Sequence, residues 1–470
     1  MMQHGLAPEF SPAAIAEAEA IDGPPSDPAP SVRDMREHLW ASIDNDDSRD
    51  LDQLSVAEPL ANDATTIFIA IADVDATVAD GGAIDEHART NTTSVYTAAG
   101  IFPMLPEKLS TDITSLNERE SRLAIVVSMT VTAAGDVTGS DIFRAHVFNH
   151  AQLTYNGVSA WLDGEAPMPP KIEAVRGLED QIRLQDRAAQ AMNARRHQRG
   201  ALDLKTMQAR PVFEGDVLAD LRADRDNRAK AMIEDFMIAA NSITASWLDA
   251  KGSPSIRRVL HTPKRWERIV DIASEVGERL PGEPDASALQ AFLLRRRSAD
   301  PETFADLSLS VVKLLGSGEY AVHRPGESLE GHFGLAVRNY THSTAPNRRF
   351  PDLMTQRLLK AALAGKPVPY DDSELNGLAR HCTEQEDNSA KVERQVQKSA
   401  AATLLEGRIG DRFDAIVTGA SPKGTWVRIS HPAVEGRVIH GANGMDVGDH
   451  VHVKLVGTDV AKGFIDFARA

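Results

Sequence analysis

The residues that most directly indicate chemistry lie between Ser42 and Leu54, where five aspartates fall within nine positions, from Asp44 to Asp52. Like charges this close repel, and aspartate disfavours helix and strand interiors, so the cluster needs water, a basic partner or a cation to neutralise it. Carboxylate oxygens are the ligands that Mg²⁺ prefers, and two such ions can activate water in phosphodiester cleavage. The alternative is a solvated acidic loop.

The elements that must position these side chains begin with two segments rich in β-branched residues, 65–74 and 123–133, which predict buried strands. Helical patterns then dominate from 151 to 250, notably over 152–162, 171–199 and 227–248. Residues 35–402 contain no repeat and no convincing linker, so we interpret them as one large α+β domain.

The two ends of the chain differ from this central region. Residues 1–34 predict a short helix that begins at Ser11-Pro12, followed by a proline-rich stretch. Residues 403–470 contain short alternating segments separated by turn signals. Five strands in about sixty residues predict a small β-barrel of OB type.

Composition narrows the class of protein. Of 470 residues, 42% are apolar and 25% are charged, an ordinary mixture for a globular protein of two or three domains. The single cysteine, Cys382, excludes an intrachain disulfide and a cysteine-based zinc site, and we expect it to be a buried hydrophobe in a protein of the reducing cytoplasm. The sequence begins without a secretory signal, and its longest apolar runs are too short to span a bilayer, so we expect no membrane association.

The net charge of −17 argues against the generally basic surface of a repressor or a histone, but it is compatible with a basic groove inside an acidic shell. Local clusters of arginine and lysine supply candidates for such a groove. Each is either a solvated helix face or a set of phosphate contacts: 195–199, 257–258, 264–265, 295–297 and 348–349.

Further motifs follow the acidic stretch in the order of the chain. Tyr96 precedes the proline-rich loop 102–109. The segments 332–336 and 340–353 together contain histidine, arginine and aspartate. Further on, Glu393 lies in a helical pattern.

The combination and order of these motifs resemble the ribonuclease II/ribonuclease R family of 3′-to-5′ exoribonucleases. Asp44, Asp50 and Asp52 have the spacing of the family's metal-binding loop, and the segment around Arg348 looks like the family's most distinctive motif. Residues 403–470 resemble the S-one type OB domain that closes most family members. The resemblance covers the chain from about residue 35 onward and implies an RNB-type catalytic domain over 35–402.

The resemblance implies processive hydrolysis of single-stranded RNA from its 3′ end to nucleoside 5′-monophosphates. It implies that Asp44, Asp50 and Asp52 are catalytic and hold Mg²⁺, with Mn²⁺ as an alternative. Arg348 would reach the scissile phosphate through its planar guanidinium, unless it forms a structural ion pair with Asp352 or Glu393.

The resemblance also implies residues that bind the substrate. Tyr96 would stack on a base, an interaction worth about 1–3 kcal/mol, or else lie in the core. Arg349 would bind the substrate next to Arg348. Glu393 would be catalytic, close to the metal ions or the terminal ribose, or would form an ordinary surface ion pair with Arg394. Three barrel residues would face either the RNA or the barrel core: Phe413, Trp426 and His431.

Two features depart from the family pattern. The family usually carries a fourth aspartate directly after the third, where this chain has Gln53, whose amide oxygen can ligate a cation but brings no charge. Family members usually begin with two cold-shock OB domains, which residues 1–34 are too few to hold. RNA capture would then rest on the catalytic channel and the barrel.

These departures leave three hypotheses open. The first is an active Mg²⁺-dependent exoribonuclease, and the second is an RNA-binding protein on a catalytically impaired scaffold. A DNA-directed nuclease would use the same metal chemistry, because discrimination by the ribose 2′-hydroxyl cannot be inferred from sequence. We favour the first, as a monomer that needs no protein partner, because the five expected residues occur together: Asp44, Asp50, Asp52, Arg348 and Tyr96.

Overall fold

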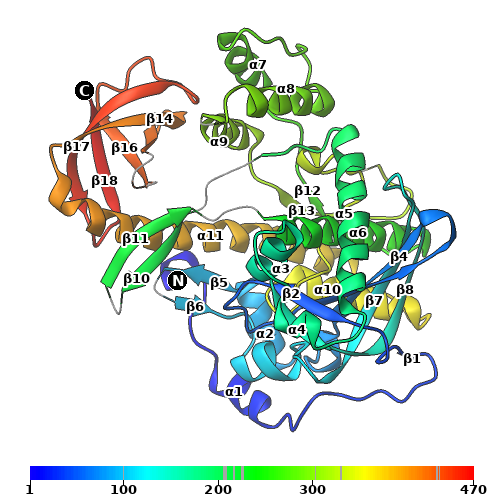
Figure 1. Ribbon diagram of the computed structural model, residues 1–470. Coiled ribbons are helices and arrows are strands. Elements are labelled where there is room, and N and C mark those ends of the chain that lie inside the picture. The colour runs from blue at the N-terminus through cyan, green and yellow to red at the C-terminus, as the bar shows by residue number, and fades with distance from the viewer. Residues whose placement is uncertain are drawn as a thin grey trace.

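Two bodies joined by one long helix make up the molecule, a large mixed α/β body and a small β-barrel (Figure 1). The α+β class and the C-terminal barrel that the sequence predicted are both confirmed. The computed structural model describes the chain apart from residues 99, 205–208, 215–216, 224–226, 302, 329–330, 430–431 and 433, and over 209–214 and 217–223 it describes the backbone alone.

A seven-stranded sheet forms the centre of the large body, in the order β1-β8-β7-β4-β3-β2-β9. Neighbouring strands are antiparallel except for β1 with β8 and β2 with β9. Both strands predicted from β-branched residues, β4 and β7, are confirmed and are buried over most of their length. The strands are β1 (Arg33–Asp34), β2 (Ala41–Asp44), β3 (Gln53–Pro59), β4 (Thr65–Ala72), β7 (Ser121–Val131), β8 (Val137–Phe148) and β9 (Ala151–Thr154).

Three helices cover this sheet where the sequence predicted helices: α3 (Tyr155–Leu162), α5 (Leu178–Gln198) and α6 (Arg228–Ala250). The prediction for 152–162 is wrong over its first residues, which form β9 because they pair with the exposed edge of β2. The prediction for 171–199 is interrupted, since Gly177 has a φ of 88° and separates the short α4 (Pro170–Glu173) from α5.

Further helices and strands precede α11 in the chain. Helix α1 begins at Pro12 and is capped by the Ser11 hydroxyl, as the sequence predicted. Among the described residues, no helix has the length and apolar character needed to cross a membrane. These elements are η1 (Met2–His4), α1 (Pro12–Glu19), η2 (Ala61–Asp63), η3 (Val74–Ala76), α2 (Ala83–Asn91), β5 (Val95–Thr97), β6 (Gly100–Phe102), η4 (Lys108–Ile113), β10 (Ala209–Glu214), β11 (Val217–Ala223), β12 (Ser255–Val259), α7 (Trp266–Glu275), α8 (Ala286–Ala299), α9 (Phe304–Leu315), β13 (Glu319–His323), η5 (Phe333–Leu335) and α10 (Phe350–Leu363).

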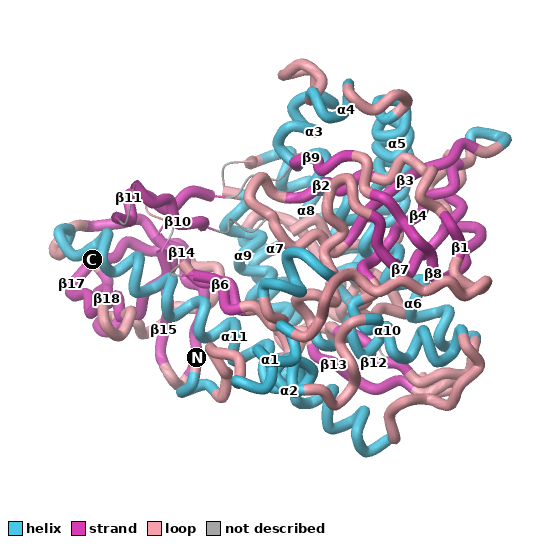
Figure 2. Tube along the Cα trace, turned by 90° about the horizontal axis from the view of Figure 1, so that it is seen from below, coloured by secondary structure: helices cyan, strands magenta, loops and turns pink. Residues whose placement is uncertain are grey.

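Helix α11 (Asp372–Leu405) joins the large body to the barrel; its 34 residues span about 50 Å (Figures 1 and 2). Ala401, Ala402 and Leu405 at its end pack into the hydrophobic core of the barrel, so the helix and the barrel are held as one unit. After the short turn η6 (Glu406–Arg408), the barrel closes in the order β14-β15-β16-β18-β17. Its strands are β14 (Arg412–Ser421), β15 (Gly424–Ile429), β16 (Val434–His440), β17 (His450–Asp459) and β18 (Phe464–Arg469).

Candidate active site and nucleic-acid groove

The three aspartates of the acidic stretch lie in the connection between two neighbouring strands. Asp44 ends β2, and Asp52 directly precedes β3, which pairs antiparallel with β2. Because β2 and β3 run in opposite directions, the last residue of β2 and the first residue of β3 lie at the same end of the two strands. The charge of Asp50 acts on both Asp44 and Asp52, so the three carboxylates form one electrostatic cluster.

These carboxylates are withdrawn from water with little positive charge to balance them. Asp52 is only 6% exposed, and the backbone N–H of Asn347 donates to its Oδ1 at 3.1 Å. Burial raises the pKa of Asp44 and of Asp50, and it raises the pKa of Asp52 to about 7. The Arg348 guanidinium, with Nε 3.4 Å from Asp52 Oδ2, opposes this rise. Three carboxylates beside one guanidinium leave a site that favours a further cation.

Gln53, at the position where the family usually has a fourth aspartate, is buried as the first residue of β3. Its Nε2 donates to the Ile43 carbonyl at 3.5 Å, directly before Asp44 in the chain. Its Oε1 is buried, and no hydrogen-bond donor in the described part of the chain reaches it. A buried acceptor without a donor is costly, so this oxygen is available to a cation or to water.

A divalent metal ion fits these donors when its coordination is completed by other groups. Among the described residues, no three carboxylate, histidine or cysteine side chains are close enough to hold a metal ion by themselves. The donors are all oxygens, which suits a hard cation, and the carboxylates are already desolvated. Mg²⁺ typically takes one or two carboxylates and fills the other positions with water and substrate phosphates. The residues therefore fit a cation that binds together with a phosphate substrate.

Tyr96 lies beside this cluster on the short hairpin of β5 and β6. Its hydroxyl donates to Asp50 Oδ2 at 3.4 Å, while the residue is 42% exposed. The structure thus brings Tyr96 to the carboxylates with part of its ring open to solvent, as base stacking requires. A pocket of about 390 Å³ adjoins the two residues and is also lined by Ile101 and Pro103.

Glu393 reaches the same region from α11 but acts on the hairpin backbone. The backbone N–H of Tyr96 donates to its Oε1 at 3.1 Å, and the Ser389 hydroxyl donates to the same oxygen at 3.4 Å. Burial raises the pKa of Glu393, and these hydrogen bonds oppose the rise. Glu393 therefore connects α11 to the residue that flanks the carboxylates.

Arg348 and Arg349 are adjacent in sequence but point to different surroundings. Arg348 faces Asp52 with a side chain that is 43% exposed, and its backbone carbonyl accepts from Ser94 at 2.9 Å. The structure does not bring Arg349 to the carboxylates. Its Nη2 donates to Asp352 Oδ1 at 2.7 Å, inside the protein, where the Asp352 side chain is fully buried. The sequence left open an ion pair between Arg348 and Asp352. In the structure, Arg349 forms the ion pair with Asp352.

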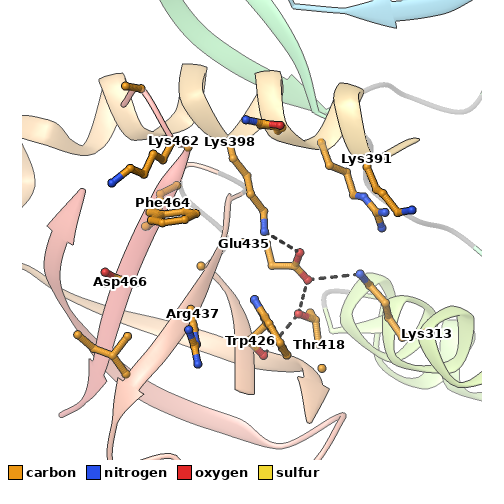
Figure 3. Close-up of a pocket in the computed structure, with 18 of the residues that line it drawn as sticks. Lys313, Lys391, Lys398, Thr418, Trp426, Glu435, Arg437, Lys462, Phe464 and Asp466 are labelled. Carbon is orange, nitrogen blue, oxygen red and sulfur yellow. Dashed lines mark hydrogen bonds and ion pairs between the residues drawn. The ribbon is translucent and has the colours of Figure 1, made fainter. Parts of the chain in front are cut away.

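A basic groove of about 1030 Å³ lies between the barrel and α11 (Figure 3). Trp426 and the exposed Phe464 form part of its barrel wall. Glu435 accepts hydrogen bonds from Thr418 and Lys313 on the floor, and it forms an ion pair with Lys398. Basic side chains outnumber the two acidic ones in the lining: Lys313, Lys391, Arg394, Lys398, Arg437 and Lys462. Positive charge with exposed aromatic rings is the combination that binds single-stranded nucleic acids.

The barrel aromatics proposed from the sequence have different surroundings. Trp426 lines the groove, whereas Val427, the next residue on β15, is fully buried. Phe413 packs against the barrel core, with its ring centroid 6.2 Å from that of Phe467. It does not line the groove. His431 lies outside the described residues.

The basic residues of the groove lie outside the arginine and lysine clusters of the sequence, although Trp426 was predicted. The cluster 195–199 instead forms ion pairs with Asp136 and Asp235. The groove lysines and arginines are spread over α9, α11, β16 and the turn between β17 and β18. A helical periodicity was the signal that could have identified part of them: Lys391, Arg394 and Lys398.

Two family models match this chain. The RNB domain matches residues 32–365, and the RNase II-type exonuclease C-terminal S1 domain matches residues 411–470. These ranges correspond to the large body and to the barrel.

Among curated proteins, the chain is 29% identical to Ribonuclease R 1 of Lactococcus lactis, over 98% of this chain and 59% of the relative. Ribonuclease R of Aquifex aeolicus is 27% identical, over 99% of this chain and 69% of that protein. The chain thus spans less than two thirds of the length of the first of these relatives.

Among solved structures, Mycoplasma genitalium RNase R in complex with ribose methylated single-stranded RNA has the same fold. It is 20% identical, with a TM-score of 0.87 over 100% of this chain and 77% of that one. The RNB match alone covers well over half of the 470 residues, and the chain therefore belongs to the RNB family, with an RNase II-type S1 domain after its RNB domain.

Proposed function

We propose that this chain is a 3′-to-5′ exoribonuclease that hydrolyses single-stranded RNA processively to nucleoside 5′-monophosphates. One observation carries the proposal: three desolvated carboxylates, a guanidinium and an exposed tyrosine converge next to a helix that leads to a basic, aromatic groove. Membership of the RNB family and the similarity to proteins named Ribonuclease R support it.

Each residue of the cluster has a separate task in this proposal. Asp44, Asp50 and Asp52 would hold Mg²⁺, with Gln53 Oε1 as a further oxygen donor. Bound Mg²⁺ would supply activation of the attacking water and neutralisation of charge at the scissile phosphate. The planar fork of Arg348 donates hydrogen bonds to a phosphate in a geometry that lysine cannot reproduce. Tyr96 orients the terminal nucleotide by stacking on its base.

Helix α11 provides the path from this cluster to the groove. Glu393 contacts the hairpin of Tyr96, and Arg394 in the next position lines the groove, as does Lys398 about one turn further on. A single strand whose 3′ end stacks on Tyr96 would follow this face of the helix toward Trp426. Successive phosphates and bases would then contact basic side chains and aromatic rings in turn.

The proposal is tested directly with a 5′-labelled single-stranded RNA, incubated with Mg²⁺ or with EDTA beside a DNA of the same sequence. A ladder that shortens from the 3′ end, on RNA only and with Mg²⁺ only, is the expected result. Intact RNA that is nevertheless retarded on a native gel would contradict it.

A specific observation favours a second candidate, an RNA-binding protein on an impaired nuclease scaffold. Gln53 brings no charge to the position where the family usually has aspartate, and a carboxamide is a poor general base. If RNA binds without turnover, Gln53→Asp is the informative variant. Hydrolysis that appears only in Gln53→Asp would establish this second function.

Replacing Tyr96 by alanine is expected to weaken binding of the RNA 3′ end about 10- to 100-fold, because a base–aromatic stack worth about 1–3 kcal/mol is lost. Tyr96→Phe keeps the ring and loses only the donor to Asp50, so its affinity should stay close to that of the wild type. Affinity is measured in EDTA by fluorescence anisotropy of a 5′-labelled RNA. Equal losses in the two variants would show that the hydroxyl, rather than the ring, carries the effect.

Neutralising two groove residues is expected to flatten the salt dependence of RNA binding. In Arg437→Gln/Lys462→Gln, the slope of log affinity against log salt should fall by about 1.4, since each phosphate contact on a single strand contributes about 0.7. The matched control is Lys366→Gln/Arg380→Gln, which removes one lysine and one arginine from exposed positions away from the groove. An equal change in both double variants would show a general charge effect.

A further inference from the structure

The first ten residues of the chain contribute a buried side chain next to the candidate active site. Leu6 is only 2% exposed and packs in a small hydrophobic cluster with Val95 and Val392, which are also buried. Phe102 and Val396 lie at the border of this cluster. The cluster is separate from the main core of the large body, and Figure 1 shows the chain start beside β5, β6 and α11.

Hydrogen bonds fix the backbone on both sides of Leu6. The Asn91 side chain accepts from Ala7 N and donates to Ala7 O, each at 2.8 Å. Gln385 Nε2 donates to Gly5 O at 3.0 Å. These contacts come from α2 and α11, so the position of Leu6 is set by two helices of the large body.

The two residues that Leu6 contacts precede the two residues that join at the site. Val95 is followed by Tyr96, and Val392 is followed by Glu393. The backbone N–H of Tyr96 donates to Glu393 Oε1 at 3.1 Å, directly after these two valines in the chain. Leu6 therefore packs where the β5–β6 hairpin meets α11. Tyr96 lies on the same hairpin, in the position after Val95.

The hairpin needs such support because it is small. Each of its strands has three residues, and an isolated two-stranded hairpin is marginally stable in water. Tyr96 and Ile101, opposite each other in its register, are 42% and 63% exposed, so they add little burial of their own. The buried contact of Val95 with Leu6 and Val392 is the apolar anchor that holds the hairpin to the helix.

We propose that Leu6 is a positioning residue, a wedge that holds the β5–β6 hairpin against α11 and thereby keeps the Tyr96 ring at the carboxylate cluster. The wedge comes from outside residues 32–365, which the RNB model matches. The inference rests on the proposed function for its catalytic consequence, but the arrangement of the hairpin is testable without any turnover.

The test compares Leu6→Ala with Ile15→Ala, a control on α1 whose side chain is 47% exposed. Hydrogen exchange followed by mass spectrometry should show amides of 93–102 exchanging about tenfold faster in Leu6→Ala and unchanged in the control. Single-turnover hydrolysis at saturating RNA should slow about 10- to 100-fold in Leu6→Ala, because the ring is misplaced. Leu6→Met, which refills the space, should restore both quantities.

A variant cycle separates positioning from general stability. In a Tyr96→Ala background, adding Leu6→Ala should change the hydrolysis rate by less than about twofold, since the ring that Leu6 positions is already absent. If Leu6→Ala slows hydrolysis as much in the Tyr96→Ala background as in the wild type, the proposal is wrong. Unchanged hydrogen exchange over 93–102 in Leu6→Ala would also overturn it. If Leu6→Ala does not fold, the milder Leu6→Val serves for the same comparison. Absence of hydrolysis in the wild type would refute the proposed function, while the exchange experiment would still decide on the wedge.

Discussion

Replacing Asp52 by asparagine will abolish RNA hydrolysis and, in the absence of divalent metal, will make the protein more stable. Asp52 is 6% exposed, and burial raises its pKa to about 7, so holding it ionised in the folded state opposes folding. The neutral amide removes this cost, which is on the order of 2–4 kcal/mol at a pH above 7. It also removes a carboxylate that a cation needs. Thermal unfolding in EDTA and hydrolysis with Mg²⁺ measure the two effects.

The pH dependence of the same group has a definite sign. Between about pH 4 and pH 7 the folded protein holds a proton on Asp52 that the unfolded chain has already lost. The stability of the metal-free wild type should therefore fall as the pH rises through this range and then level off. Because a cation binds the ionised carboxylate and displaces this proton, Mg²⁺ affinity and hydrolysis at limiting Mg²⁺ should increase with pH.

The control for Asp52 is Asp271→Asn, at an exposed position on α7. This variant should retain activity and should keep the wild-type dependence of stability on pH. A lower melting temperature of Asp52→Asn in EDTA would show that the Asp52 carboxylate stabilises the fold, contrary to the electrostatic argument.

Arg348→Lys and Arg349→Lys are identical changes at adjacent positions. We expect the first to lower hydrolysis and the second to lower stability. Arg348→Lys should lower hydrolysis about 100-fold or more, because lysine cannot reproduce the planar fork of donors at a phosphate. Its stability should change by less than about 1 kcal/mol, since the arginine side chain is 43% exposed and the positive charge near Asp52 is retained.

Arg349→Lys should instead lower the free energy of unfolding by about 2–4 kcal/mol, because the fully buried Asp352 loses the hydrogen bond that Arg349 Nη2 donates to its Oδ1. Hydrolysis per folded molecule should remain within about fivefold of the wild type. Chemical denaturation and single-turnover kinetics on both variants give the comparison. A large loss of turnover in Arg349→Lys with unchanged stability would assign Arg349 to the substrate, as the family resemblance suggested.

The strands and the barrel were predictable because their signals are local. β-Branched runs marked β4 and β7, and regular turns marked the five barrel strands. The first residues of 152–162 were not predictable in the same way, since they form β9 only by pairing with β2, which is remote in sequence. Pairing with a strand that is remote in sequence overrides the local preference of these residues for a helix.

The sequence indicated several of the residues that the structure brings together at the candidate site, but it did not indicate their contacts. The order of the motifs indicated Asp44, Asp52 and Tyr96, and the structure brings them together. Nothing in the sequence distinguishes Arg348 from Arg349; their surroundings differ because α10 begins at Phe350 and places Asp352 within reach of Arg349. The groove is assembled from elements far apart in the chain, so no window of sequence contains it.

The continuity of α11 sets the distance between the carboxylate cluster and the barrel. The helix carries Glu393 at the hairpin of Tyr96 and Leu405 in the core of the barrel, about 18 Å apart along its axis. Because a continuous helix resists compression, the barrel is held at a set distance from the carboxylates. If the chain shortens RNA from the 3′ end as proposed, the RNA would contact both the carboxylates and the barrel until it became too short to span that distance. In the proposed function, the helix would therefore set the length at which the shortened RNA leaves the barrel.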